Sequence, residues 1–305
     1  MKTNKIFVSG LMNIETTVKI KSFPINYFPI DYPFFGVNSS VSGVGVNVGK
    51  ALKKLNNDVK FTSMIGNDFE GDNVIKCLEE ENIDSGLVKR ILKETPSSAI
   101  LYDDEGKRQI YCDLKDIQSA EYPIDEKIKN AIKECDIAII CNTNYNRNIL
   151  KYVKSIKIPV ATDVHVLNDI EDEYNKEFME NADILFLSDE QIEGDHEVFI
   201  SKLKDRYRNL KIVVLGRGNK GAMMYTRNDD MIRVFPAVEL GKVVNTVGAG
   251  DALFSAFVNY YSKGFTPIDA INRAQIFASY KIGFNGAANG FINEERVEEL
   301  FNNIY

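Results

Sequence analysis

The sequence predicts an α/β protein in which a mostly parallel central sheet is covered by helices on both faces. In the second half of the chain, short apolar runs alternate with helical patterns, which is typical of parallel strands buried on both faces. Hydrophobic residues make up 44% of the 305 positions, which is ample for a large core. This length allows two domains or one, but no internal repeat or low-complexity linker divides the chain. We therefore expect one domain over residues 1–305.

The expected elements follow in order along the chain. Apolar runs predict strands at 5–10, 59–66, 136–141, 158–163, 182–187, 211–216 and 222–226. Amphipathic segments predict helices at about 42–55, 72–81, 252–261, 267–283 and 294–303. Residues 97–113 predict a hairpin, because two strand-like runs flank the acidic turn 103–106.

Residues 16–41 differ from the rest of the chain, because aromatic side chains and three prolines gather there. Proline excludes a helix and confines a strand to the edge of a sheet. So many exposed aromatic side chains need a cover, which can be a substrate, another segment or another subunit.

Composition excludes several classes of function. The net charge is −7, and no basic tract or stripe predicts binding to nucleic acid. No apolar run approaches the roughly 18 residues that a membrane span needs, and the apolar run 6–8 is too short for a signal peptide. The four scattered cysteines predict reduced thiols in the cytoplasm. His165 and His196 are the only histidines, which leaves little for a histidine-rich metal site or a Ser-His-Asp triad.

The stretch 242–254 is the strongest candidate site. Val243 and Val244 predict the end of a strand, and a turn of small residues leads into the predicted helix 252–261. The free N–H groups and the dipole at a helix N-terminus attract anions. Gly248 and Gly250 let an anion approach the backbone closely. We expect this turn to bind an anion, and a phosphate group in particular.

Asp251 lies in the same turn. A carboxylate beside an anion site is unfavourable unless it has a chemical role, such as taking a proton from an attacking hydroxyl group. The alternative is that Asp251 only caps the helix. This stretch alone leaves both interpretations open.

The segment Asn-Thr-Val-Gly-Ala-Gly-Asp at 245–251 resembles the C-terminal signature of the ribokinase-like (PfkB) family of carbohydrate kinases, usually Asp-Thr-x-Gly-Ala-Gly-Asp. The resemblance implies a three-layer α/β/α sandwich with a small β-sheet lid. It also implies that Asp251 is the catalytic base and that Gly248, Ala249 and Gly250 form the anion hole for the transferring phosphate. Asn245 stands where the family usually has Asp.

A second match lies at 42–50, which resembles the family's N-terminal signature Gly-Gly-x-Gly-x-Asn, with Ser42 in place of the first glycine. It implies that Asn47 bonds the acceptor hydroxyls and that Ser42 and Gly43 line the acceptor pocket. Glu15 aligns with an acceptor-binding Asp of the family, and Asn13 is a second candidate. A dinucleotide fingerprint is the weaker alternative, because no clean buried strand precedes these glycines.

The nucleotide side is predicted less directly. Residues 216–221 spell Gly-x-Gly-x-x-Gly, but a strand rather than a helix is expected after them, which contradicts a dinucleotide site and leaves a plain hairpin turn open. The resemblance implies ATP and Mg²⁺ as cofactors, and a loop at 284–290 whose carbonyls can hold a monovalent cation such as K⁺. The residues that it assigns to the nucleotide are Gly216, Lys220, Gly221, Thr246, Gln275, Gly286 and Asn289.

The ligands of the metal remain unknown from the sequence. The family usually has Asn-x-x-Glu where this chain has Ser188 and Gln191, so Gln191 and Glu190 are the candidates.

These observations predict an ATP-dependent kinase that phosphorylates a hydroxyl of a neutral sugar similar to ribose or fructose. A nucleoside kinase and a catalytically silent sugar- or nucleotide-binding regulator remain alternatives. The motif positions expected around the acceptor include two carboxylates and no basic side chain, which favours a neutral acceptor over a sugar phosphate. By resemblance, residues 16–41 and 97–113 form a lid that covers the acceptor and pairs across a homodimer.

Overall fold

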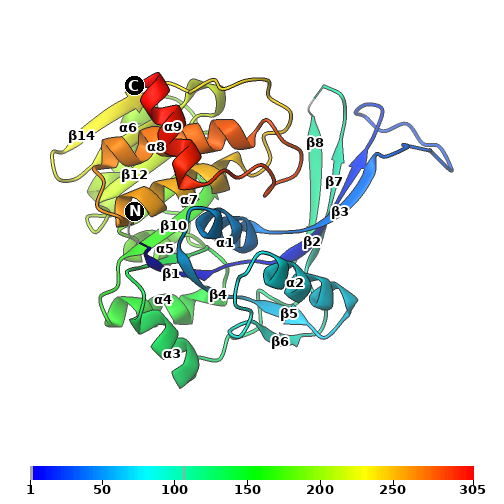
Figure 1. The fold of residues 1–305 in the computed structure, drawn as a ribbon, viewed down its shortest axis with the longest axis horizontal. Coiled ribbons are helices and arrows are strands. Elements are labelled where there is room, and N and C mark those ends of the chain that lie inside the picture. Colours follow the sequence, from blue (N-terminus) through cyan, green and yellow to red (C-terminus); the bar gives the residue numbers. More distant parts are fainter. Residues whose placement is uncertain (1–2, 106) are drawn as a thin grey trace.

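The computed structural model describes residues 3–105 and 107–305, and it has the predicted α/β architecture (Figure 1). Residues 1–2 and Gly106, which belongs to the turn of the predicted hairpin, lie outside the described residues. Within them, the larger sheet has the strand order β14-β13-β12-β11-β10-β9-β1-β4. Its strands are β1 (Lys5–Ser9), β4 (Asp58–Thr62), β9 (Ile137–Ile140), β10 (Val160–Val166), β11 (Ile184–Ser188), β12 (Ile212–Gly216), β13 (Ala222–Thr226) and β14 (Met231–Phe235).

Pairing in this sheet is parallel from β12 to β4 and antiparallel between β12, β13 and β14. The predicted strand 59–66 is wrong as one element. It divides into β4 and β5 (Met64–Gly66), which pairs with β6 (Lys89–Leu92) in a separate two-stranded sheet. The hydroxyl of Thr62 donates to the Leu87 carbonyl, and the Lys89 N–H donates to the Ser63 carbonyl. Because of these bonds, the chain after Thr62 leaves the main sheet and pairs with β6.

Helices cover both faces of the larger sheet, as the alternation of apolar runs predicts. Side chains of β1 alternate between the two faces, so Ile6 and Val8 belong to one core cluster and Phe7 to another. The first cluster includes α1, α7, α8 and α9, and the opposite face packs against α3, α4, α5 and α6. The helices are α1 (Val44–Lys54), α2 (Phe69–Glu80), α3 (Glu126–Lys133), α4 (Asn146–Ser155), α5 (Lys176–Asn181), α6 (His196–Arg206), α7 (Ala249–Ser262), α8 (Pro267–Lys281), α9 (Glu294–Ile304) and the 3₁₀ helix η1 (Gly218–Lys220).

A smaller sheet projects from the body on the right of Figure 1. Its order is β3-β2-β7-β8, with β2 and β7 parallel and the two outer pairs antiparallel. The strands are β2 (Asn13–Lys19), β3 (Val37–Ser42), β7 (Ser97–Tyr102) and β8 (Arg108–Asp113). Between β2 and β3, the chain runs through an irregular excursion at 20–36, where Phe34 and Phe35 are 85% and 100% exposed.

Two short junctions join the smaller sheet to the body. Three residues separate the end of β1 at Ser9 from the start of β2 at Asn13, and Gly43 alone separates β3 from α1. Gly43 has φ = 106°, a conformation that favours glycine, and a Cβ there would meet the Leu11 carbonyl at 2.6 Å. The two strands that start and end at these junctions therefore have little freedom relative to the body.

Capping side chains mark the start of α8 at the predicted residue and the start of α2 three residues before the predicted one. Thr266 precedes α8 and accepts a hydrogen bond of 3.1 Å from the Asp269 N–H, while Pro267 fills the first helical position. Asp68 accepts a bond of 2.8 Å from the Gly71 N–H at the start of α2. None of the helices in the described part of the chain combines the length and apolar character needed to cross a membrane.

Candidate active site

The predicted anion-binding turn lies between an extended segment and the first turn of α7. The strand predicted to end at Val243 and Val244 is wrong, because both side chains are about half exposed and neither residue belongs to a strand. Instead, the N–H groups of Val244 and Asn245 both donate to the Ile282 carbonyl, at 2.8 and 3.0 Å. The carbonyl at the end of α8 thus accepts the hydrogen bonds of these two N–H groups, which a neighbouring strand would accept in a sheet.

The turn itself is closed by short-range hydrogen bonds. The side-chain oxygen of Asn245 accepts a bond of 2.8 Å from the Val247 N–H, so an amide at this position keeps the acceptor that an aspartate would supply. Gly248 is the N-cap of α7 with φ = 78°. A Cβ at Gly248 would collide with the Ala287 carbonyl, so only glycine lets the loop at 286–290 pack against the turn.

Helix α7 begins at Ala249, three residues before its predicted start, and Asp251 therefore lies in its first turn. The Asp251 carboxylate accepts a hydrogen bond of 2.8 Å from the Asn47 side-chain amide on α1. The N-cap position belongs to Gly248, and no side-chain cap bond forms at this end of α7. The Asp251 side chain therefore does not cap this helix in the structure.

Two partly buried carboxylates influence each other in this site. Burial raises the pKa of the Asp251 carboxyl, the Asn47 hydrogen bond and nearby His165 oppose that rise, and Asp163 adds to it. Burial also raises the pKa of the Glu15 carboxyl, and the negative charge of Asp251 adds to that shift although a bond from Ser42 opposes it. Proton affinity is therefore higher here than for exposed carboxylates.

The predicted acceptor residues come from β2, the end of β3 and the start of α1. Asn13 pairs with Ser42 in the antiparallel register, and both are buried. The Asn13 amide donates to the Ser98 hydroxyl at 2.9 Å, while the side-chain oxygens of Asn13 and Asn47 have no hydrogen-bond partner within residues 3–105 and 107–305. Buried acceptors without partners fit a ligand that carries several hydroxyl donors.

Sequence reasoning missed three residues around Asp251. Lys281, on the last turn of α8, is completely buried, and its ammonium donates to the Val247 carbonyl. Asp163 on β10 is buried. Asp163 and His165 both act electrostatically on the Asp251 carboxylate. Asp163 could have been suspected, because open α/β sheets place ligands at the carboxyl ends of their strands. Nothing in the local sequence distinguishes Lys281 from a lysine that favours an exposed helix C-terminus.

The predicted nucleotide residues are dispersed over several segments. Gly216 ends β12, Lys220 is exposed in η1, and Gly221 leads into the antiparallel strand β13, which excludes the dinucleotide fingerprint. No hydrogen bond between described residues connects the 216–221 turn to the 245–251 turn. Thr246 is exposed in the turn before α7, whereas Gln275 is buried in α8, and its side-chain nitrogen lacks a partner in the described chain.

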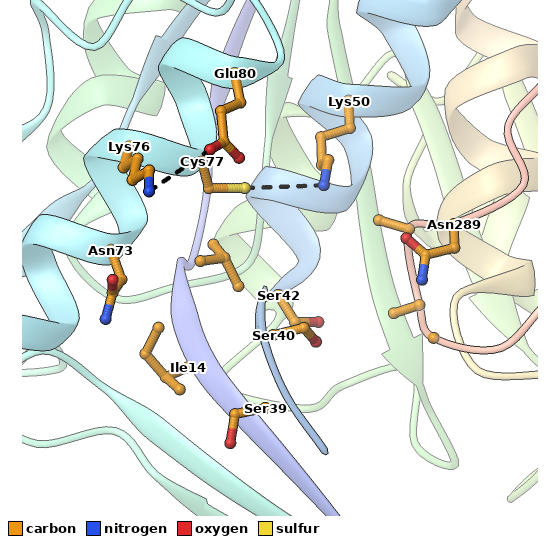
Figure 2. Close-up of a pocket in the computed structure, with 14 residues that line it drawn as sticks. Ile14, Ser39, Ser40, Ser42, Lys50, Asn73, Lys76, Cys77, Glu80 and Asn289 are labelled. Carbon is orange, nitrogen blue, oxygen red and sulfur yellow. Dashed lines mark hydrogen bonds and ion pairs between the residues drawn. The ribbon is translucent and has the colours of Figure 1, made fainter.

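A cavity of about 460 Å³ lies between α1, α2, β3 and the loop at 286–289 (Figure 2). Ser42, Gly286 and Asn289 line it, so it connects one predicted acceptor residue with two predicted nucleotide residues. Lys50 and Cys77 also line it, and the Lys50 Nζ donates to the Cys77 Sγ at 3.8 Å. Asp251 and Asn47 are not among the lining residues from the described chain, so this cavity adjoins the candidate active site without containing it.

The candidate metal ligands lie on the surface. Glu190 and Gln191 are exposed in the turn after β11. Across the described ranges, no three His, Cys, Asp or Glu side chains come together in a group that could hold a metal ion.

The chain is similar to known kinases in sequence and in fold. The family model for pfkB family carbohydrate kinase matches residues 4–294. A nucleoside kinase of Methanocaldococcus jannaschii is 21% identical over 272 residues, which cover 87% of this chain and 85% of the relative. A deoxyribokinase of Salmonella typhi is 22% identical over 305 residues, which cover 96% of this chain and 97% of the relative. The Arabidopsis thaliana ribokinase, solved with ribose and ATP, has a TM-score of 0.83 at 18% identity, over 98% of this chain and 99% of its own.

Proposed function

The chain belongs to the PfkB family of carbohydrate kinases, which transfer phosphoryl groups to alcohol acceptors, and from this premise we propose that it uses ATP to phosphorylate a hydroxyl of a neutral sugar. The observation that carries the proposal is the position of Asp251. Its carboxylate lies in the first turn of α7, which also carries the N–H groups of Gly248 and Gly250, and is bonded by Asn47. The Ala249 N–H donates to the Thr246 carbonyl at 3.1 Å. A base and an anion hole side by side are the parts that phosphoryl transfer needs.

In the proposed reaction, Asp251 takes the proton of the acceptor hydroxyl while the oxygen of that hydroxyl attacks the γ-phosphorus of ATP. The bond from that phosphorus to the bridging oxygen breaks, and ADP leaves. The N–H groups at the start of α7 stabilise the negative charge on the phosphoryl oxygens. Mg²⁺ enters bound to the phosphates of ATP, as part of the substrate.

A neutral acceptor is supported by the side chains around Asp251. Asn13, Glu15, Ser42 and Asn47 offer amide, carboxylate and hydroxyl groups, which suit the hydroxyls of a polyol. A nucleoside is the second candidate, because its ribose presents the same groups and a nucleoside kinase is among the relatives.

The test is ATP turnover with ribose, deoxyribose, fructose, a set of nucleosides and fructose 6-phosphate. Phosphorylation of a sugar or nucleoside supports the proposal, and the preferred acceptor decides between the two candidates. Binding of acceptor and ATP without any turnover would contradict it and favour the regulator alternative.

The smaller sheet acts as a lid over the acceptor, and the exposed aromatic side chains between β2 and β3 meet a second copy of the chain in a homodimer. All four cysteines are free thiols, which supports a reducing compartment such as the cytoplasm.

A further inference from the structure

Lys281 is a buried cation whose partner is a backbone carbonyl. Its side chain has no exposed area, and its ammonium donates to the carbonyl of Val247, the residue before the N-cap of α7. Removing an ammonium from water is unfavourable unless fixed dipoles or charges replace the water. The position of this ammonium beside the proposed anion hole suggests what its charge does.

The contact restricts the orientation of one N–H group in the anion hole. Val247 and Gly248 share a peptide bond, and in a trans peptide the C=O and the N–H point in opposite directions. An ammonium that holds the Val247 carbonyl on one side therefore directs the Gly248 N–H to the other side. Two hydrogen bonds from Val244 and Asn245 to Ile282, next to Lys281, fix the same end of α8 to the turn.

We propose that Lys281 is a positioning residue for phosphoryl transfer, whose ammonium orients the Gly248 N–H toward the transferring phosphate and takes the place of a soluble monovalent cation. This inference rests on the proposed kinase function. The electrostatic effect acts in the same direction, because a fixed positive charge beneath the turn makes the site more attractive for an anion.

The charges around Lys281 are compatible with an ammonium at neutral pH. Burial lowers its pKa to about 8, while the carboxylates of Asp251 on α7 and Glu15 on β2 oppose the decrease. Arg108 of β8 acts on Glu15, and Asp163 and His165 of β10 act on Asp251. A group with this pKa is mostly protonated at pH 7.

The presence of Lys281 changes the expectation for K⁺. A K⁺ ion held by carbonyls near this turn would lie beside the positive charge of Lys281. Asn245 supplies no carboxylate that could balance the charges of both K⁺ and Lys281. The residues present therefore do not fit a K⁺ requirement.

The test compares wild type with Lys281→Met in potassium chloride and in choline chloride. We expect wild-type kcat to be equal in the two salts. In the variant, kcat should fall about 10²–10³-fold, as for the loss of one aligned anion-hole donor, with little change in the KM of the acceptor. Lys133→Met, on the exposed end of α3, is the matched control for loss of a lysine and should keep full activity.

Calorimetry adds a readout that does not depend on turnover. Lys281→Met should bind Mg²⁺·ADP as wild type does but bind a non-hydrolysable ATP analogue more weakly, because only the analogue places a phosphate group at the turn. If no acceptor is phosphorylated, the proposed function fails, and this binding difference alone still decides the role of Lys281.

Two results would overturn the inference. One is a wild-type enzyme that is inactive in choline chloride and active in potassium chloride, which needs no variant to fold. The other is a Lys281→Met enzyme with wild-type kcat and wild-type affinity for the analogue.

Discussion

The side-chain amide of Asn47 donates a 2.8 Å hydrogen bond to the Asp251 carboxylate, although 204 positions separate the two residues. Asn47 lies on α1 and Asp251 on α7, and these helices pack against each other in one core cluster. The bond joins the N-terminal and the C-terminal signatures of the chain in one site. It also lowers the proton affinity of the proposed base.

Replacing the proposed base should separate catalysis from stability. Asp251→Asn should lose roughly 10²–10⁴-fold in kcat while still binding Mg²⁺·ATP and the acceptor. Because burial raises the pKa of Asp251 above its usual 3.8, the folded state binds more protons than the unfolded state between 3.8 and the raised value. The carboxylate therefore destabilises the fold above that window, and the variant should have an equal or higher Tm at pH 7.

Steady-state kinetics, calorimetry and thermal denaturation of Asp251→Asn check this prediction. Asp205→Asn, on the exposed surface of α6, is the control and should leave both kcat and Tm unchanged. A folded Asp251→Asn enzyme with near-normal kcat would exclude the base. A Tm lowered by an amount that corresponds to about 1 kcal/mol would instead support a capping role.

Removing the partner of the base should shift the pH profile. The Asn47 hydrogen bond lowers the pKa of Asp251, so Asn47→Ala should raise it and move the acid limb of kcat/KM to higher pH. The measurement is kcat/KM from acid to neutral pH for wild type, Asn47→Ala and the surface control Asn303→Ala. An acid limb that stays in place in Asn47→Ala would show that this bond does not control the ionisation that limits catalysis.

Acceptor choice should follow the charge of the pocket. At one fixed Mg²⁺·ATP concentration, kcat/KM for ribose, fructose or a nucleoside should exceed that for fructose 6-phosphate, because Glu15 and Asp251 repel a second phosphate group. Each hydrogen bond from a hydroxyl to a charged group contributes about 1.5–3 kcal/mol. Lys19, Lys21 and Arg108 are among the basic residues on or beside the smaller sheet. A clear preference for the sugar phosphate would show that these residues, rather than the pocket around Asp251, determine specificity.

The exposed aromatic side chains between β2 and β3 predict a dimer. The double variant Phe34→Ser, Phe35→Asn removes two adjacent, highly exposed rings of that excursion, and Asn tolerates the positive φ of 57° at position 35. Sedimentation should show a dimer for wild type, a monomer for the double variant and a dimer for the control Val198→Ser on α6. A wild-type chain that stays monomeric at all concentrations would remove the dimer from the proposal and leave the lid untouched.

Lys281 should make stability depend on pH in the alkaline range. Its pKa decreases from 10.5 to about 8 on folding, so the unfolded state binds more protons between these values. Stability increases with pH wherever the unfolded state binds more protons. The free energy of unfolding of wild type relative to Lys281→Met should therefore be constant below pH 8 and increase from about 8 toward 10.5.

Urea denaturation at a series of pH values measures this difference. Wild type relative to Lys133→Met should show no such slope, because Lys133 is exposed. A difference between wild type and Lys281→Met that decreases with pH, or does not vary, would show that the ammonium is not desolvated in the folded protein.

Local patterns were sufficient for most of the fold, because strands buried on both faces must be apolar throughout and helices that cover them must be amphipathic. The errors occurred where partners are distant. Val243 and Val244 have high strand propensity, but their segment binds the end of α8 rather than another strand, and propensity does not specify the partner. The end of β4 also depends on distant partners, because the Thr62 hydroxyl binds the Leu87 carbonyl and the Ser63 carbonyl binds the Lys89 N–H.

The candidate site was predicted as two separate signatures, and the contacts between them required the structure. Anion binding at Gly248 and Gly250 and the carboxylate of Asp251 can be predicted from the sequence, because they depend only on neighbouring residues. The bond from Asn47 to Asp251 and the burial of Lys281 arise from how α1, α7 and α8 pack, and no nearby residue encodes them.

The short junctions at residues 10–12 and at Gly43 have an evolutionary consequence. Insertions there would displace Asn13, Ser42 or Asn47 and disturb the proposed acceptor site. The excursion at 20–36 has no such constraint, since it leaves β2 and returns to β3 at the ends of those strands far from the body. Changes at 20–36 can therefore alter the proposed dimer contact while the proposed acceptor site keeps its geometry.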